Sequence, residues 1–305
     1  MDRGRRDIRD WIVALTLLAG LAACQSDGQT HAPSEIDIAA LNWIGTDVDP
    51  VVHLSQEPTT CLAHGDMPRV LRGELLFNSP LLLGGQAAKA ELSCAACHRN
   101  GRGNPDFVLP GLSDVPGTAD VSNGFFSKLR ADRVFNPVRI PDLARAEGRT
   151  RVDRQTEGVL ETFLHAQIVE EFAGSAPERE TVLDLAAYIR ALDDRACDTE
   201  QVRQPSWRDE MKRLRTGADH INKTQTAVSI DYINAMRAAL GRLHARYQGP
   251  QLAAVRDQMV KISRDLAADP TSLALVEALD RLEASLEAFE VYSLYEPSVL
   301  SQALR

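Results

Sequence analysis

The chain has no hydrophobic run long enough to span a bilayer, no excess of positive charge and no stretch with the alternation of a β-strand. Its main apolar run, residues 11–23, is too short for a comfortable transmembrane helix, which needs about 20 residues. Lys and Arg number 34 against 43 Asp and Glu, so nucleic acid and anionic lipid are disfavoured as partners and a basic partner fits better. With 305 residues, 25% charged and 44% hydrophobic, the composition excludes collagenous, low-complexity and polytopic membrane classes.

Residues 1–23 have the features of a bacterial signal peptide. Four arginines lie near the start, the apolar run follows, and it ends in Leu21-Ala22-Ala23-Cys24. This ending resembles the lipobox of bacterial lipoproteins, in which the cysteine is lipidated and becomes the new N-terminus. An ordinary secretory signal cleaved near Ala23 and a short anchor are the alternatives. By the same resemblance Gln25 favours the outer membrane, so we expect a periplasmic protein lipid-anchored at Cys24.

The mature chain divides into three segments. Residues 24–60 are rich in Ser, Asp, Thr and Pro and predict a tether with one helical turn. Residues 61–200 combine long Gly- and Pro-rich loops with apolar periodicity that predicts helices near 68–77, 156–172 and 181–192. Loops of that length inside a compact domain usually surround something functional.

Residues 206–305 have long periodic stretches separated by Gly249-Pro250 and Asp269-Pro270. The spacing predicts helices over roughly 206–218, 225–247, 251–267 and 271–292, and short connections make them antiparallel neighbours. We therefore expect an all-α protein, with a loop-rich helical domain at 61–200 followed by an antiparallel helical bundle at 206–305. The negative excess of the mature chain lies between residues 24 and 205, because 206–305 contains 13 charges of each sign.

The most specific motif is Cys94-Ala95-Ala96-Cys97-His98. In a C-x-x-C-H segment the two thiols form thioethers with the vinyl groups of haem, and the histidine binds the iron. The motif predicts one covalent haem c on Cys94 and Cys97, with His98 as the proximal ligand. Export supports this interpretation, since covalent attachment occurs outside the cytoplasm.

Three other interpretations of the motif were weighed. A structural zinc site usually needs a second Cys or His pair, and the remaining cysteines are isolated. A thioredoxin-like C-x-x-C opens a helix after a strand, and no strand pattern precedes this one. The third alternative is a local disulfide or a chance match.

Two cysteines, Cys61 and Cys197, remain after lipid and haem have been assigned. In an oxidising compartment two such cysteines are expected to form a disulfide, here across the segment that contains the motif. Two buried free thiols are the alternative.

Three segments together resemble the N-helix, haem motif and C-helix of cytochrome c domains: Arg72 to Phe77, Cys94 to His98 and Leu185 to Leu192. More narrowly, Leu75-Leu76-Phe77-Asn78-Ser79-Pro80 and Asn100-Gly101-Arg102-Gly103 resemble bacterial di-haem cytochrome c peroxidases and the related methylamine-utilisation (MauG-like) enzymes. The resemblance covers about residues 65 to 200 and implies a cytochrome c fold. The chain departs from the peroxidases in having one C-x-x-C-H motif instead of two, and in residues 152–155, which differ from the family's Asp-Gly-Arg segment.

The sixth iron position distinguishes electron transfer from catalysis, because Met or His there closes the site and an open position admits peroxide. Residues 99–210 contain no Met, where a simple cytochrome c would have its ligand. The candidates are His165 first, then Met67, His64 and Met211, although a surface role for His165 and a core role for Met67 are the alternatives.

Two further roles near the haem are open. A backbone carbonyl near Pro110 or Pro141 is expected to orient the His98 Nδ1 proton. The candidates for contact with haem propionates are Arg99, Arg102, Arg130, Arg133 and Arg139.

The sequence therefore favours a membrane-anchored c-type cytochrome that carries single electrons to or from a periplasmic partner protein. A peroxidase-like enzyme that reduces hydrogen peroxide or oxidises a partner protein is one alternative. A haem-bearing lipoprotein whose bundle binds another subunit, without catalysis, is the other.

Overall fold

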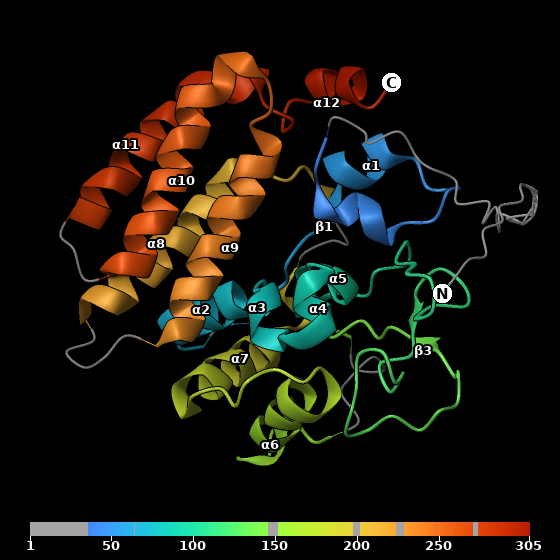
Figure 1. The fold of residues 1–305 in the computed structure, drawn as a ribbon. Coiled ribbons are helices and arrows are strands. Elements are labelled where there is room, and N and C mark those ends of the chain that lie inside the picture. The colour runs from blue at the N-terminus through green and yellow to red at the C-terminus, as the bar shows by residue number, and fades with distance from the viewer. Residues whose placement is uncertain (1–35, 64, 146–151, 198–201, 224–228, 271–273) are drawn as a thin grey trace, which may run out of the picture. The chain divides into compact units, whose positions relative to one another are not determined.

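The structure is a computed structural model that describes residues 36–63, 65–145, 152–197, 202–223, 229–270 and 274–305. These residues belong to one compact unit, Glu35–Arg305. Helices dominate it, and its strands form two short antiparallel pairs, which confirms the all-α class (Figure 1). No helix in these ranges combines the length and apolar character needed to cross a membrane. The expected signal peptide, with Cys24, lies outside the described residues.

The helices are α1 (Pro50–Ser55), α2 (Met67–Phe77), α3 (Pro80–Leu83), α4 (Gly85–Lys89), α5 (Cys94–Cys97), α6 (Val159–Ala166), α7 (Arg179–Ala191), α8 (Trp207–Lys223), α9 (Ile230–Arg246), α10 (Ala253–Ala268), α11 (Ala274–Phe289) and α12 (Pro297–Ala303). The strand pairs are β1 (Glu57–Pro58) with β4 (Val202–Arg203), and β2 (Thr118–Ala119) with β3 (Val138–Arg139). A 3₁₀ turn, η1 (Ala39–Trp43), precedes α1, and a π turn, η3 (Gln167–Glu171), follows α6.

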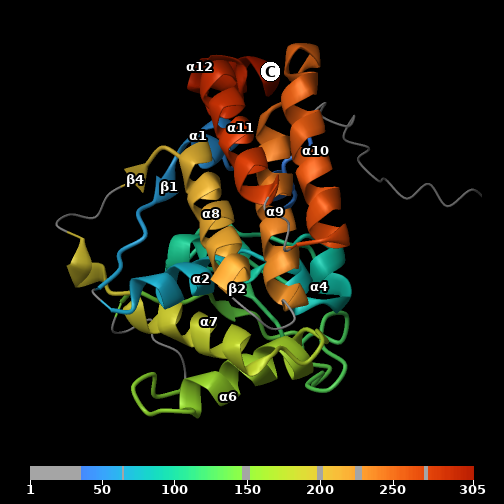
Figure 2. The same ribbon diagram turned by 90° about the vertical axis from the view of Figure 1, so that its left-hand side faces the viewer.

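The long C-terminal helices form the expected bundle. α8 packs on α9, α9 on α10, α10 on α11, and α11 on α8, which closes the ring of contacts (Figures 1 and 2). Ser229 caps α9 by accepting a hydrogen bond from the N–H of Asp231. α8 extends to Lys223, beyond its expected end at 218, because Ile221 continues the buried face of the helix.

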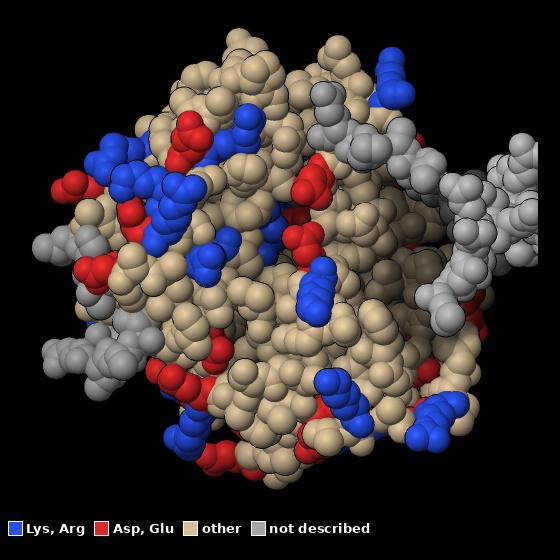
Figure 3. All heavy atoms as spheres, viewed as in Figure 1, with Lys and Arg blue, Asp and Glu red and all other residues tan. Residues whose placement is uncertain are grey.

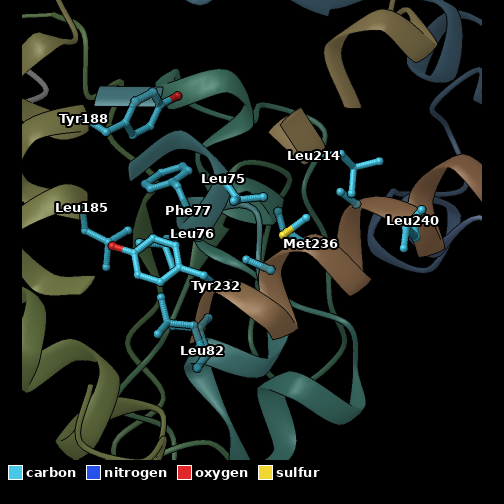
Figure 4. Packing of buried hydrophobic residues seen from close by; sticks show 14 of the residues in the cluster. Leu75, Leu76, Phe77, Leu82, Leu185, Tyr188, Leu214, Tyr232, Met236 and Leu240 are labelled. Carbon is cyan, nitrogen blue, oxygen red and sulfur yellow. The ribbon is translucent and has the colours of Figure 1, made fainter. Parts of the chain in front are cut away.

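α2 and α7 pack directly on each other at Gly73. A Cβ atom built on Gly73 would lie 2.0 Å from the backbone oxygen of Asp184 and 2.7 Å from Cβ of Tyr188, so only glycine fits at this crossing. Phe77 and Tyr188 extend the contact, with ring centroids 5.1 Å apart (Figure 4). The two expected helices at 68–77 and 181–192 are therefore present and in contact.

A buried carboxylate joins α2 and α7 to the bundle. Asp184, fully buried in α7, accepts hydrogen bonds from Arg72 Nε at 2.5 Å and from the Tyr232 hydroxyl at 2.7 Å. Arg69 Nε lies 3.2 Å from its other oxygen. Arg69 and Arg72 belong to α2 and Tyr232 belongs to α9. The carboxylate of Asp184 therefore links α7 to both α2 and α9.

One hydrophobic core crosses the expected boundary between residues 61–200 and 206–305. Leu75 and Leu185 lie in the same cluster as Leu214 and Met236 of the bundle (Figure 4). Buried Arg213 of α8 also donates to Glu74 of α2 at 2.9 Å. The two segments are thus packed together, and whether either folds alone stays a prediction.

The expected tether over residues 24–60 is too long. From Ile36 the chain belongs to the compact unit, and Ile36, Ile38 and Leu54 form a second small core with Leu294 and Leu300. The short apolar runs in residues 36–54 do not by themselves predict a core, because the residues they pack against lie in the last turns of the chain. Any tether is confined to residues that precede this core.

Cys61 and Cys197 form a disulfide in the structure. The same two segments are held by backbone hydrogen bonds, from Asp193 N to Cys61 O at 3.1 Å and from Ala63 N to Ala191 O at 2.7 Å. The bond therefore fastens the chain before α2 to the chain after α7.

We expect neither Cys61 nor Cys197 to react with a thiol reagent in protein purified without reductant. Both should react after reduction under denaturing conditions, and mass spectrometry of the labelled peptides measures each site. Labelling of both positions before reduction would contradict the bond.

Candidate functional site

Helix α5 is a single turn that contains both cysteines of the motif. The N–H of His98 donates to the carbonyl of Cys94 at 2.8 Å, which closes the turn and puts residues 94 and 97 on one side of it. Both thiols are unbonded and partly buried. Burial raises the pKa of each thiol to about 12, whereas a thioredoxin-like pair needs a lowered pKa.

The ring of His98 is oriented by the backbone of a distant loop. His98 Nδ1 lies 3.0 Å from the carbonyl oxygen of Pro141. Because a carbonyl can only accept, Nδ1 carries the proton and Nε2 keeps its lone pair. Burial lowers the pKa of His98 to about 4, against an opposing effect of the Pro141 hydrogen bond. Of the two carbonyls left open by the sequence, the structure has Pro141 behind the ring, while Pro110 is exposed and pairs with Ser113.

The Pro141 loop is fixed on both sides of the carbonyl. The N–H of Ile140 donates to Gly117 O at 2.9 Å, and that of Leu143 donates to Gly101 O at 3.1 Å. Arg102, itself buried, donates to the carboxylate of Asp142 at 2.7 Å. The loop is therefore held to the turn that follows His98, and the acceptor is in place before any ligand binds.

A buried arginine, Arg154, was missed as a site residue by the sequence analysis. It donates to Leu143 O at 2.6 Å and to Ile189 O at 3.1 Å, and so links the Pro141 loop to α7. Its positive charge contributes to lowering the pKa of His98, after the larger effect of burial. The only sequence signal was its place in residues 152–155, where the chain departs from the peroxidase pattern.

Among the described residues, none of the candidates for the sixth position has a hydrogen bond or ring contact with His98. His165 is exposed on α6, and Met67 is 37% exposed at the start of α2. Met211 of α8 is buried in the hydrophobic core, and His64 lies outside the described residues. The ring contact and hydrogen bond described for His98 are with Phe77 and Pro141 instead.

The loop arginines expected near propionates divide into two groups. Arg99 donates to His53 O, Arg102 pairs with Asp142, and Arg130 pairs with Glu170. Arg133 and Arg139 are exposed. The first group therefore already has protein partners, although Arg130 is also exposed, and the second group is exposed to solvent.

The donor set argues for thioether chemistry over zinc. Cys61 and Cys197 are used in a disulfide, and no group of three or more His, Cys, Asp or Glu side chains suited to a metal ion occurs in the part of the chain that the structure describes. A tetrahedral zinc site would need such a group. Two adjacent free thiols and one imidazole with a free Nε2 instead match what covalent haem requires.

Comparison with protein-family models, curated proteins and solved structures found no match.

Proposed function

We propose that the protein is a periplasmic, lipid-anchored c-type cytochrome that carries single electrons through one haem bound at Cys94 and Cys97. One observation carries the proposal. Two unbonded thiols lie on one turn of helix, and the histidine that follows them donates through Nδ1 to a fixed carbonyl, which leaves Nε2 for iron. The haem, when bound, supplies an iron that changes by one electron.

The residues around the motif hold the ligand. Cys94 and Cys97 would form the thioethers, and these bonds reduce the need for a deep pocket. The Pro141 carbonyl keeps the His98 ring from rotating and increases the basicity of Nε2, as partners of metal-bound histidines generally do. Asp142 and Arg102 support this role by fixing the loop that carries Pro141.

Exposed apolar side chains between residues 115 and 138 also support contact with a large apolar group or a partner. They lie in the segment that runs through β2 and β3 toward Pro141, and exposed apolar patches are typical of surfaces that a ligand or partner covers. These are Val115, Phe125, Leu129, Val134, Phe135 and Val138, each more than half exposed. We attribute part of this surface to haem contact and part to docking of the redox partner, which the acidic charge of residues 24–205 predicts to be basic.

We expect Cys24→Ser to prevent lipidation, so that the protein leaves the membrane fraction or keeps its signal peptide. Fractionation and intact-mass measurement distinguish these forms. If the wild type is cleaved and carries no lipid, and the variant fractionates unchanged, the anchor is disproved.

An open iron site that reacts with peroxide is the second candidate function. The observation that favours it is the exposure of the His165 and Met67 side chains to solvent, because a carrier needs a sixth ligand. With one haem, such an enzyme would take electrons from an external donor protein.

A spectrum of the oxidised protein decides between the two candidates. For the carrier we expect a low-spin spectrum that hydrogen peroxide leaves unchanged. Because His165 and Met67 are both exposed in the structure, His165→Ala and Met67→Ala test whether either side chain is nevertheless the sixth ligand, since loss of that ligand would convert the spectrum to high spin. A wild type that is high-spin and binds cyanide or peroxide would contradict the carrier and support the enzyme.

A further inference from the structure

A cavity of about 710 Å³ lies beside the motif, on the side away from its ligands. It is lined by α9, by the segment of η1 and α1, and by Ala95 and Ala96 between the two cysteines. Cys94, Cys97 and His98 do not line it. In the view of Figure 3, charged side chains of both signs surround the hollow beside the helical bundle. Its volume is in the range of small-molecule sites and is separate from the proposed haem ligands.

Two arginines of this cavity meet at the end of α1. Arg99 Nη2 donates to the carbonyl of His53 at 2.7 Å, and Arg246 Nη2 donates to the neighbouring carbonyl of Leu54 at 2.9 Å. Arg246 Nη1 also donates to Leu294 O at 3.0 Å. Among the described residues neither guanidinium contacts a carboxylate, so each keeps donor groups for another acceptor.

Three carboxylates that line the cavity have arginine partners. Glu57 and Asp209 pair with Arg203, and Glu210 pairs with Arg213 and Arg242. Asp106, close to Arg99, lies 2.8 Å from Nδ1 of His53. Burial lowers the pKa of both Arg99 and Arg246, and the two charges also repel each other at Arg99. An anion between them would relieve both effects.

Part of the remaining cavity wall offers apolar contact, and the other part is charged, with Asp37, Glu57, Glu91, Asp209, Glu210, Arg213, Arg237 and Arg242. Trp43 and Leu54 line the apolar part, as do Ala95 and the ring of Tyr295, over which the Arg246 guanidinium lies at 5.2 Å from the centroid. The planar guanidinium of an arginine can donate two parallel hydrogen bonds to the oxygens of a carboxylate or phosphate. Apolar side chains beside such a guanidinium suit a ligand with both an anionic group and an apolar part.

We infer that this cavity binds a small organic anion, with its carboxylate or phosphate between Arg99 and Arg246 and its apolar part toward Trp43 and Ala95. The inference is independent of the proposed electron transfer, because none of these contacts involves the haem ligands. The alternative is that both arginines only cap the carbonyls at the end of α1.

Isothermal titration of the full-length protein with four probes tests the site. Benzoate and phenyl phosphate should bind at least tenfold more tightly than benzamide, which has the same ring without the charge. Inorganic phosphate, which lacks the ring, should also bind more weakly than phenyl phosphate. The order of benzoate and phenyl phosphate identifies whether carboxylate or phosphate is preferred.

Variants locate the binding. Arg99→Gln should weaken binding of the preferred probe at least tenfold, whereas Arg264→Gln, an exposed arginine of α10, should not. Gly241→Leu adds a side chain to the cavity wall where a Cβ would meet nothing within 4 Å, so it should block binding while the helix stays intact. Circular dichroism and the haem spectrum confirm that each variant is folded.

The inference is overturned if none of the anions binds at millimolar concentration or if benzamide binds as well as benzoate. It is also overturned if Gly241→Leu, folded and haem-loaded, binds the probes like the wild type. A loss of stability in Arg99→Gln together with wild-type binding would show that the arginines serve only as caps.

Discussion

A Cys94→Ala, Cys97→Ala double variant should carry no covalent haem, whereas the wild-type protein should keep its haem through denaturation in acid. The reason is that two thioethers survive loss of the fold, while ligation by His98 alone does not. Absorption of the reduced pyridine complex after acid precipitation measures the remaining haem. We expect loss of essentially all of the signal, because no other pair of free thiols occurs among the described residues.

The matched control is a second pair of cysteines in the same domain. Cys61→Ala, Cys197→Ala removes the disulfide and should leave covalent haem in the fraction that folds. If the wild type contains zinc by elemental analysis and no iron, haem attachment is disproved. A double variant at positions 94 and 97 that keeps acid-stable haem would also disprove it.

Local signals in the sequence predicted local structure well. The four bundle helices could be predicted because apolar periodicity runs through each of them, and Gly249-Pro250 and Asp269-Pro270 separate α9, α10 and α11. The turn at Cys94 to His98 is likewise a local arrangement of five residues. The sequence analysis left Pro110 and Pro141 open as the residue behind the His98 ring, and only the fold distinguishes them, because it has the Pro141 carbonyl at the ring.

Long-range contacts could not be predicted in this way. Arg154 acts through carbonyls at positions 143 and 189. The two cavity arginines, Arg99 and Arg246, lie near each other because both donate to neighbouring carbonyls of α1. Solvated loop charge is the ordinary interpretation of such arginines in a sequence. The packing of Ile36 and Leu54 on Leu294 and Leu300 could not be predicted for the same reason, since these residues are far apart in sequence.

Gly73→Ala should destabilise the protein by about 3 kcal/mol or more, because the new methyl group cannot be accommodated between α2 and α7. Its Cβ would lie 2.0 Å from the Asp184 carbonyl oxygen and 2.7 Å from the Asp184 carbonyl carbon, both backbone atoms of a packed helix. The helices would have to separate, and the separation would strain the Asp184 contacts to Arg72 and Tyr232. Urea unfolding followed by circular dichroism measures the change in the free energy of unfolding.

Gly241→Ala, the same substitution in another helix, should have the opposite effect. Gly241 lies on an exposed part of α9, and a Cβ there meets nothing within 4 Å. Alanine should therefore stabilise α9 by about 0.5–1 kcal/mol through its higher helix propensity. Because both changes remove a helical glycine, the difference between them isolates the contact of α2 with α7. Equal and small effects at the two positions would show that the two helices are not in contact at Gly73.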